Sequence, residues 1–262
     1  MDLKLANHTA VVQGASRGLG LGIARALAEE GVDLVLTARN LPALEAAARS
    51  IEEATGRRAV PLALDSASPE AASRAVEAAQ AAFGRLDILV CNSGGPPAGA
   101  VLDLTDQQWL AAAELLVLGP VRLLREALPL LRRSPAPRFF VVTSSSTRQP
   151  VPGLALSNTY RPGVHGLVKA LSDELAADRV RCHSLAPGRF DTDRLAHLFK
   201  VQSEKSGKPA AEIRAAVESS IPAGRLGDPA EFGKLAAFLA SPHADYLTGQ
   251  NWMVDGGLTR AL

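Results

Sequence analysis

Three glycines in the segment Gln13–Gly20 constrain the fold more than any other feature of this chain. Gly14, Gly18 and Gly20 follow a short apolar run and precede a stretch of helical periodicity. Gly14 allows a tight turn off a strand, while Gly18 and Gly20 let an anion approach the backbone at a helix N-terminus. Free N–H groups and the helix dipole favour negative charge there. The segment predicts a dinucleotide phosphate site; a tight strand–helix turn without a ligand is the alternative.

The rest of the chain alternates short apolar runs with longer runs of helical period. The predicted strands are Thr9–Gln13, Asp33–Thr37, Ala59–Leu64, Leu86–Cys91, Arg138–Thr143, Val180–Ala186 and Asn251–Val254. The predicted helices are Leu19–Glu30, Leu41–Thr55, Pro69–Gly84, Gln107–Arg132 and Arg161–Asp178. Such alternation requires right-handed crossovers and a parallel sheet covered on both faces. We expect an α/β fold, a Rossmann-type doubly wound parallel seven-stranded sheet, in a single domain over residues 1–262.

Composition excludes several other classes of protein. The 28 basic and 27 acidic residues leave a net charge of +1, so no bulk field attracts nucleic acid or an anionic membrane. No apolar run approaches the roughly 20 residues of a membrane helix, and the polar N-terminus lacks a signal-peptide pattern. Two cysteines cannot form a disulfide scaffold or a four-cysteine zinc site. We expect a cytoplasmic protein with no metal, nucleic-acid or membrane partner.

One long segment interrupts the alternation. Residues 189–225 are polar and partly helical, contain no predicted strand, and follow the sixth strand. In open α/β sheets, ligands bind beyond the carboxyl ends of the strands. The segment is therefore a candidate substrate lid, and a surface elaboration is the alternative.

Several motifs occur in an order that resembles the short-chain dehydrogenase/reductase family, over almost the whole chain. The Gly-x3-Gly-x-Gly spacing is joined by Asn92-Ser93-Gly94-Gly95 after the fourth strand and by Asp65 after the third. Pro187-Gly188 with Thr192, and Asp255-Gly256-Gly257, complete the set. The length and the C-terminal pattern resemble the 3-oxoacyl carrier-protein reductase branch. The resemblance implies these cofactor-binding residues: Gly14, Ser16, Arg17, Gly18, Leu19, Gly20, Asp65, Asn92, Ser93, Gly94, Pro187, Gly188 and Thr192.

The residues after the second strand bear on the choice of nicotinamide cofactor. An acidic residue there selects NAD through the ribose hydroxyls, whereas an arginine accommodates the 2′-phosphate of NADP. This strand is followed by Ala38-Arg39-Asn40, and Arg17 lies within the phosphate loop. Two guanidinium groups can bracket one phosphate. NADP is the expected cofactor and NAD the less favoured one, unless Arg39 is only a solvated turn residue.

The resemblance does not extend to most of the family's catalytic side chains. Ser144 ends the fifth strand and matches the family's catalytic serine, but Ser157 stands at the tyrosine position and Arg161 at the lysine position. Leu116 stands where the family has a helix asparagine. Tyr160 is adjacent in sequence, but lies about 100° around the helix from Arg161. His165 shares a helical face with Ser157 and Arg161, one to two turns further on.

These observations give two competing functions. The first is an NADP(H)-dependent oxidoreductase acting on a carbonyl or hydroxyl of a small or acyl substrate, with catalytic Ser144, Ser157 and Arg161; Arg161 also bonds the nicotinamide ribose. The second is a non-catalytic dinucleotide-binding sensor or assembly protein on the same fold. The resemblance also implies a homodimer or homotetramer. Its candidate interface residues are Leu167, Val168, Leu171, Leu175, Leu258 and Leu262.

Overall fold

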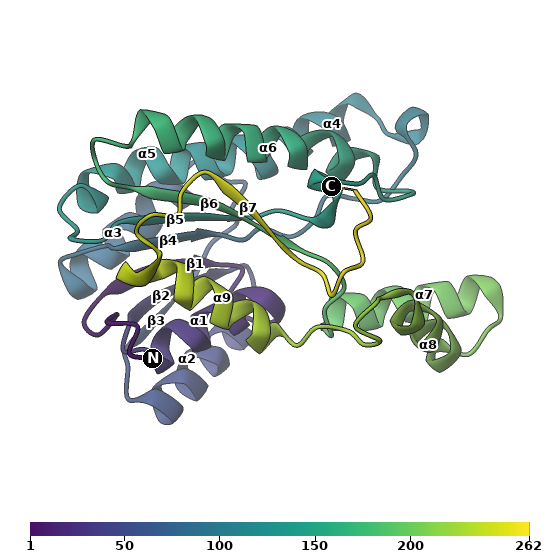
Figure 1. Ribbon diagram of the computed structural model, residues 1–262, viewed down its shortest axis with the longest axis horizontal. Helices are drawn as coiled ribbons and strands as arrows, with labels where there is room; N and C mark the ends of the chain where they lie inside the picture. Colours follow the sequence, from purple (N-terminus) through teal and green to yellow (C-terminus); the bar gives the residue numbers. More distant parts are fainter. Residues whose placement is uncertain (262) are drawn as a thin grey trace.

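The computed structural model, which describes residues 1–261, contains one parallel sheet with the strand order β3-β2-β1-β4-β5-β6-β7 (Figure 1). The strands are β1 (Thr9–Gln13), β2 (Asp33–Ala38), β3 (Ala59–Ala63), β4 (Ile88–Cys91), β5 (Arg138–Val142), β6 (Arg181–Pro187) and β7 (Gln250–Val254). All six strand pairs are parallel. The chain runs outward from β1 to β3 and then returns to pair β4 with β1. This reversal creates a crevice at the carboxyl ends of β1 and β4, where doubly wound sheets bind ligands.

Helices cover both faces of the sheet, as the predicted doubly wound arrangement requires (Figure 1). One face carries α1 (Gly18–Glu29), α2 (Leu41–Thr55) and α9 (Pro229–Ala240). The other carries α3 (Ala71–Phe83), α4 (Asp106–Ala113), α5 (Gly119–Leu131) and α6 (Ala155–Glu174). Each face has its own apolar core. The strands are apolar on both sides because both sides are buried: Val12 faces the α1 core, and its neighbour Val11 faces the opposite core.

Glycines at the contact between α1 and α9 allow the two helices to pack closely. A Cβ on Gly22 would overlap the carbonyl oxygen of Pro229, and a Cβ on Gly233 would overlap the carbonyl oxygen of Gly22. The two helices therefore approach at backbone distance. This contact positions the helix whose N-terminus faces the crevice.

Two predicted helices differ from the observed ones. The predicted helix Gln107–Arg132 is divided into α4 and α5 by a π-helical turn, Glu114–Leu118, so it does not continue as one regular helix. The predicted helix Arg161–Asp178 begins earlier, at Ala155, and ends at Glu174. Pro162 is a residue that favours the first turn of a helix. It lies two turns inside α6 instead, where its missing N–H costs only one helical hydrogen bond.

Residues 189–225 contain two helices, α7 (Asp193–Ser206) and α8 (Ala210–Ser220), which project from the carboxyl edge of the sheet (Figure 1). They enclose a small apolar core of their own, made by Leu195, Phe199, Ile213, Ile221 and Leu226. No helix within residues 1–261 combines the length and apolar character needed to span a bilayer.

Candidate active site

The loop from β1 to α1 has the geometry that the glycine spacing predicts. Gly14 and Gly18 have φ of 63° and 57°, which non-glycine residues rarely adopt. Arg17 caps α1 with extended backbone, and no side chain accepts a hydrogen bond from the first turn of the helix. The first N–H groups of α1 therefore remain available to an anion. Ser16 is half-buried in this loop, and Leu19 packs against the core beneath it.

Asn92, from the loop after β4, closes the other side of this glycine loop. Its Nδ2 donates to the carbonyl oxygen of Gly14 at 3.5 Å. A Cβ on Gly20 would overlap that same carbonyl oxygen and lie 2.7 Å from Asn92 Nδ2. A Cβ on Gly14 would overlap the backbone of Asn92. The loop is a backbone cradle that side chains would obstruct, and it fits a dinucleotide.

The end of β2 presents a basic side chain and no carboxylate. Arg39 is exposed, and within residues 1–261 its side chain makes no hydrogen bond or ion pair. The side chain of Asn40 is occupied as the cap of α2, accepting from the Ala43 N–H at 3.1 Å. Arg17 is also largely exposed and lies 3.7 Å from Asp193 of α7. Arg39 is free to meet a phosphate, and Arg17 has only a long, solvent-exposed ion pair with Asp193 that a phosphate could replace.

The other residues predicted to bind the cofactor lie in loops at the same edge of the sheet. Asp65 follows β3 and accepts from the Ala67 N–H at 3.1 Å, while Ser93 and Gly94 follow β4. Gly188 directly follows β6, and a Cβ on it would lie 2.5 Å from that of Asp255. The same chain then reaches Thr192.

Thr192 joins the α7–α8 segment to the phosphate loop. Its hydroxyl caps α7 by accepting from the Leu195 N–H at 3.4 Å. A Cβ on Gly18 would lie 3.4 Å from its methyl group. The start of α7 therefore lies directly against the glycine loop, as the Arg17–Asp193 pair also indicates.

Three serines form a connected group where β5 meets α6. Ser144, half-buried beyond the end of β5, accepts a hydrogen bond from the Ser146 N–H at 3.1 Å. The Ser146 hydroxyl lies 3.0 Å from the hydroxyl of Ser157 on α6. Ser144 and Ser157 are therefore linked through Ser146, and Ser157 is 7% exposed. Sequence reasoning missed Ser146; the signal was the Ser144-Ser145-Ser146 run itself, since any of the three hydroxyls could have faced α6.

Arg161 lies one helical turn beyond Ser157, on the same buried face of α6. Its side chain is 6% exposed and donates from Nη1 to the carbonyl oxygen of Val142, while Nε has no hydrogen-bond partner within residues 1–261. Burial, together with the charge of Arg194, lowers the pKa of Arg161 to about 10. At neutral pH the guanidinium is still charged, so the site holds a desolvated cation.

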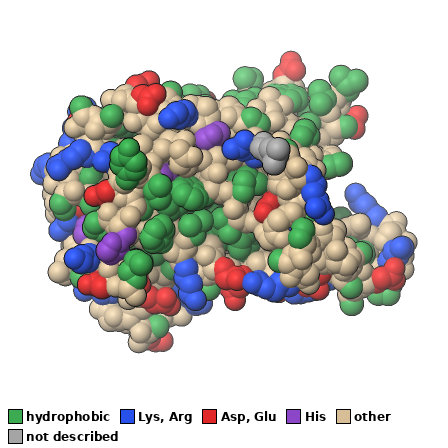
Figure 2. All heavy atoms as spheres, viewed as in Figure 1, with side chains coloured by type: hydrophobic (Ala, Val, Ile, Leu, Met, Phe, Trp, Pro, Cys, Tyr) green, Lys and Arg blue, Asp and Glu red, His purple; other side chains and the backbone are tan. Residues whose placement is uncertain are grey.

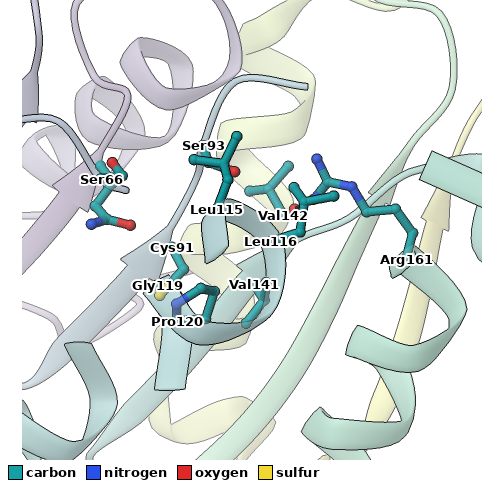
Figure 3. A pocket seen from close by; sticks show the side chains of 11 residues that line it. Ser66, Cys91, Ser93, Leu115, Leu116, Gly119, Pro120, Val141, Val142 and Arg161 are labelled. Carbon is teal, nitrogen blue, oxygen red and sulfur yellow. Dashed lines mark hydrogen bonds between the residues drawn. The ribbon is translucent and has the colours of Figure 1, made fainter. Parts of the chain in front are cut away.

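A narrow hollow beside Arg161 reaches from α6 across the ends of β4 and β5 to β1. It is lined by Gln13, Ser66, Cys91, Ser93, Leu115, Leu116, Gly119, Pro120, Val141, Val142 and Arg161. Figure 3 shows the Arg161 side chain reaching toward Leu116 and Val142. Leu116 belongs to the π-helical turn and offers Arg161 no hydrogen-bond acceptor. Burial raises the pKa of the Cys91 thiol at the floor of the hollow, so that thiol is neutral.

Neither Tyr160 nor His165 joins this group. The Tyr160 hydroxyl donates to the carbonyl oxygen of Trp109 at 3.0 Å, and the two rings pack 6.0 Å apart. His165 Nδ1 lies 3.2 Å from the Ser184 hydroxyl on β6. Burial, with the charges of Arg148 and Lys169, lowers the pKa of His165. Both side chains serve packing between elements.

Comparison with known proteins agrees with this architecture. A family model described as enoyl-(acyl carrier protein) reductase matches residues 14–259. The 3-oxoacyl-[acyl-carrier-protein] reductase of Vibrio cholerae is 32% identical over 256 residues, covering 98% of this chain and 99% of the relative.

Solved structures extend the likeness to three dimensions. L-sorbose reductase from Gluconobacter frateurii, complexed with NADPH and L-sorbose, superposes with a TM-score of 0.96 at 32% identity, over 100% of both chains. An NADPH-bound short chain oxidoreductase from Pseudomonas aeruginosa PAO1, described as containing an atypical catalytic center, gives a TM-score of 0.90 at 28% identity, over 98% of this chain and 99% of its own. This chain belongs to the short-chain dehydrogenase/reductase family.

Proposed function

We propose that this chain is an NADPH-dependent reductase that acts on the carbonyl of a small or acyl substrate, through an active site built on Ser144, Ser157 and Arg161. The observation that carries the proposal is the placement of the serine group at the same sheet edge as the glycine cradle. A reaction between a cofactor and a substrate requires that both lie at one edge.

The cofactor assignment rests on charge at two positions. Arg39 and the solvent-exposed Arg17 would bracket a 2′-phosphate, and within residues 1–261 no carboxylate at the end of β2 competes for the ribose. The α1 N-terminus and the glycine cradle would hold the pyrophosphate. Ser93 and Gly94 would lie beside the adenine ribose, and the Pro187–Thr192 loop would flank the nicotinamide. The NADPH complexes of the sorbose reductase and of the PAO1 oxidoreductase are consistent with this assignment.

When bound, NADPH supplies the hydride that reduces a carbonyl carbon, and the carbonyl oxygen takes up a proton. Ser144, whose oxygen accepts from the Ser146 N–H, would donate a hydrogen bond to that oxygen, and the proton that completes the alcohol would come from solvent water. Arg161 would stabilise negative charge that develops there, and the family resemblance implies that its guanidinium would also bond the nicotinamide ribose. Ser157 would act indirectly, by holding Ser146 in position.

The test is an NADPH oxidation assay with ketones and acyl thioesters, alongside calorimetric titration of NADPH. Binding of NADPH together with turnover of at least one carbonyl compound is the expected result. Failure of NADPH to bind would contradict the whole proposal.

A second candidate function is favoured by a specific observation. The Ser157 hydroxyl is bonded to Ser146 and is nearly inaccessible. The Tyr160 phenol is bonded to the Trp109 carbonyl oxygen, so neither hydroxyl is placed to deliver a proton to a substrate. A dinucleotide-binding sensor or assembly protein would have this arrangement. Tight NADPH binding without turnover of any carbonyl in the panel would establish this second candidate in place of the first.

The α7–α8 segment is proposed as a substrate lid, because it borders the phosphate loop through Thr192 and Asp193. A homodimer or homotetramer is also proposed. Val168 and Leu175 are buried in the core and Leu258 packs on the α7–α8 core, while Leu262 lies outside the described residues. The strongly exposed apolar side chains instead include Val101, Leu102 and Leu110, which are close together in sequence. Light scattering tests this assembly; the mass of a single chain would contradict it.

A further inference from the structure

Two guanidinium groups near the catalytic edge have no negative partner in the described structure. The first is Arg161, of which only 6% is exposed to solvent. The hollow beside it is lined by apolar and neutral polar side chains, with no other charged residue, and the guanidinium bonds the Val142 carbonyl oxygen. A buried charge without a counter-charge is unfavourable, so this group is poised to gain from an arriving anion.

The second is Arg194, in the first turn of α7. A Cβ on Gly95 would overlap both terminal nitrogens of this side chain, so the guanidinium lies directly on the backbone that follows Ser93. A positive charge at a helix N-terminus opposes the helix dipole, so helix stability does not explain the residue. Its neighbour Asp193 pairs with Arg17, and no carboxylate within residues 1–261 pairs with Arg194.

The two guanidinium groups act on the same region from opposite elements, α6 and α7. Both groups lie beside the loop after β4, since Arg194 contacts Gly95 and Arg161 lines the same hollow as Ser93, and the charge of Arg194 contributes to the lowered pKa of Arg161. Between them lie the loop after β4 and the hollow beside the ends of β4 and β5. In Figure 2, basic side chains border the opening between the α7–α8 projection and the rest of the molecule.

Building on the proposed function, we propose that the substrate is an anionic carbonyl compound, an oxo acid, whose carboxylate is bound by Arg194 while Arg161 supplies buried positive charge behind it. The planar guanidinium of Arg194 matches a carboxylate with two parallel hydrogen bonds. The competing source of negative charge is the cofactor pyrophosphate. That group already has the α1 N-terminus, with Arg17 beside it, which leaves Arg194 for the substrate.

The experiment compares three oxo acids, pyruvate, acetoacetate and levulinate, with their methyl esters. Affinity for the NADPH-saturated protein is measured by calorimetry, and KM is measured where turnover occurs. At least one acid is expected to bind tenfold or more tightly than its ester. Arg194→Gln is expected to abolish this preference, while Lys200→Gln, an exposed change on the same helix, is expected to retain it.

Two outcomes would overturn the inference. Acids that bind no better than their esters to the unmodified protein would contradict it without the use of any variant. An Arg194→Gln protein that loses NADPH affinity but keeps a preference for acids would assign Arg194 to the cofactor phosphates. Either result leaves the reductase proposal standing if NADPH binds and a neutral ketone is reduced. Loss of NADPH binding by the unmodified protein is the separate failure of the proposed function.

Discussion

The two halves of the sheet edge are built in different ways. In the half around β1 and α1, the glycine loop meets Asn92 through backbone groups, at distances that leave no room for a Cβ. In the half around β5 and α6, side chains bond to one another and to carbonyl oxygens: Ser146 to Ser157, and Arg161 to Val142. The geometry of the first half depends on glycines that lack a Cβ atom. The geometry of the second half depends on which polar side chains are present.

This difference explains why the two halves tolerate change differently. A backbone cradle is disrupted by any added side chain, because the atoms overlap whatever their chemistry. A group of hydroxyls and a guanidinium can be exchanged for others as long as each buried polar atom finds a partner. The catalytic half can therefore differ among proteins that share the cradle.

The largest expected effect comes from adding one methyl group to the cradle. Gly20→Ala places a Cβ against the Gly14 carbonyl oxygen and Asn92 Nδ2, so NADPH affinity should fall by roughly a hundredfold or more, equal to about 2.7 kcal/mol. Calorimetric titration measures this loss. Gly166→Ala on α6, where nothing lies within 4 Å, is the matched control and should be slightly more stable than the unmodified protein. Unchanged NADPH binding in Gly20→Ala would refute the comparison.

The next effect tests the catalytic half alone. Ser144→Ala should lower kcat/KM by roughly a hundredfold, the size of effect seen when a donor to a developing oxyanion is lost, with NADPH affinity unchanged. Tyr160→Phe should change kcat/KM little, because that hydroxyl bonds the Trp109 carbonyl oxygen. Steady-state kinetics and calorimetry separate the two quantities. If Tyr160→Phe abolishes turnover while NADPH still binds, Tyr160 is the proton donor and the assigned register is wrong.

Arg39→Asp tests whether charge, rather than backbone shape, sets the choice of cofactor. Loss of one or two charge-assisted hydrogen bonds, each worth about 1.5–3 kcal/mol, should weaken NADPH binding at least tenfold and make NADH the preferred nucleotide. Arg49→Asp, an exposed change on α2, is the control. An unmodified protein that binds NADH as tightly as NADPH would remove the basis for this prediction.

Arg161→Met should separate stability from activity. The folded-state pKa of about 10 is below the ordinary value of 12.5, so the cost of the buried charge is fully present below pH 10 and lessens above it. Removing the charge should therefore stabilise the fold at pH 7, by about 1–2 kcal/mol, while lowering kcat/KM. Urea unfolding measures the first effect. Destabilisation by several kcal/mol would mean that Arg161 has a counter-charge.

The smallest expected effect is that of pH on kcat/KM near neutrality, where we expect no change. Serine hydroxyls do not titrate in the working range, and Arg161 keeps its charge until its pKa of about 10. With NADPH saturating, kcat/KM should be flat from about pH 6 to 9 and fall above pH 10. A pH–rate series with the best carbonyl substrate checks this profile. A sharp transition near neutral pH would reveal another titrating group in the reaction.

The amino-acid sequence by itself was enough for the fold and for the backbone geometry of the glycine loop. Strands buried on both faces leave apolar runs, and a strand–glycine–helix turn leaves its spacing, so both signals are local in the chain. The seven-stranded parallel sheet was predicted from these signals and confirmed. The capping boxes at Thr105 and Asp228 are equally local, because each depends on residues three apart in the chain.

Only the tertiary structure decided how the catalytic half is connected. Ser146 contacts Ser157, and Gly95 contacts Arg194, but the separation of each pair in sequence does not predict the contact. The start of α6 and the π-helical turn were likewise decided by the tertiary structure. There, packing against the sheet prevails over the preference of Pro162 for a first helical turn and over the regular helical periodicity of Gln107–Arg132. A hydrogen bond between side chains on different elements depends on where the whole fold places them, and for that reason it cannot be deduced from either segment alone.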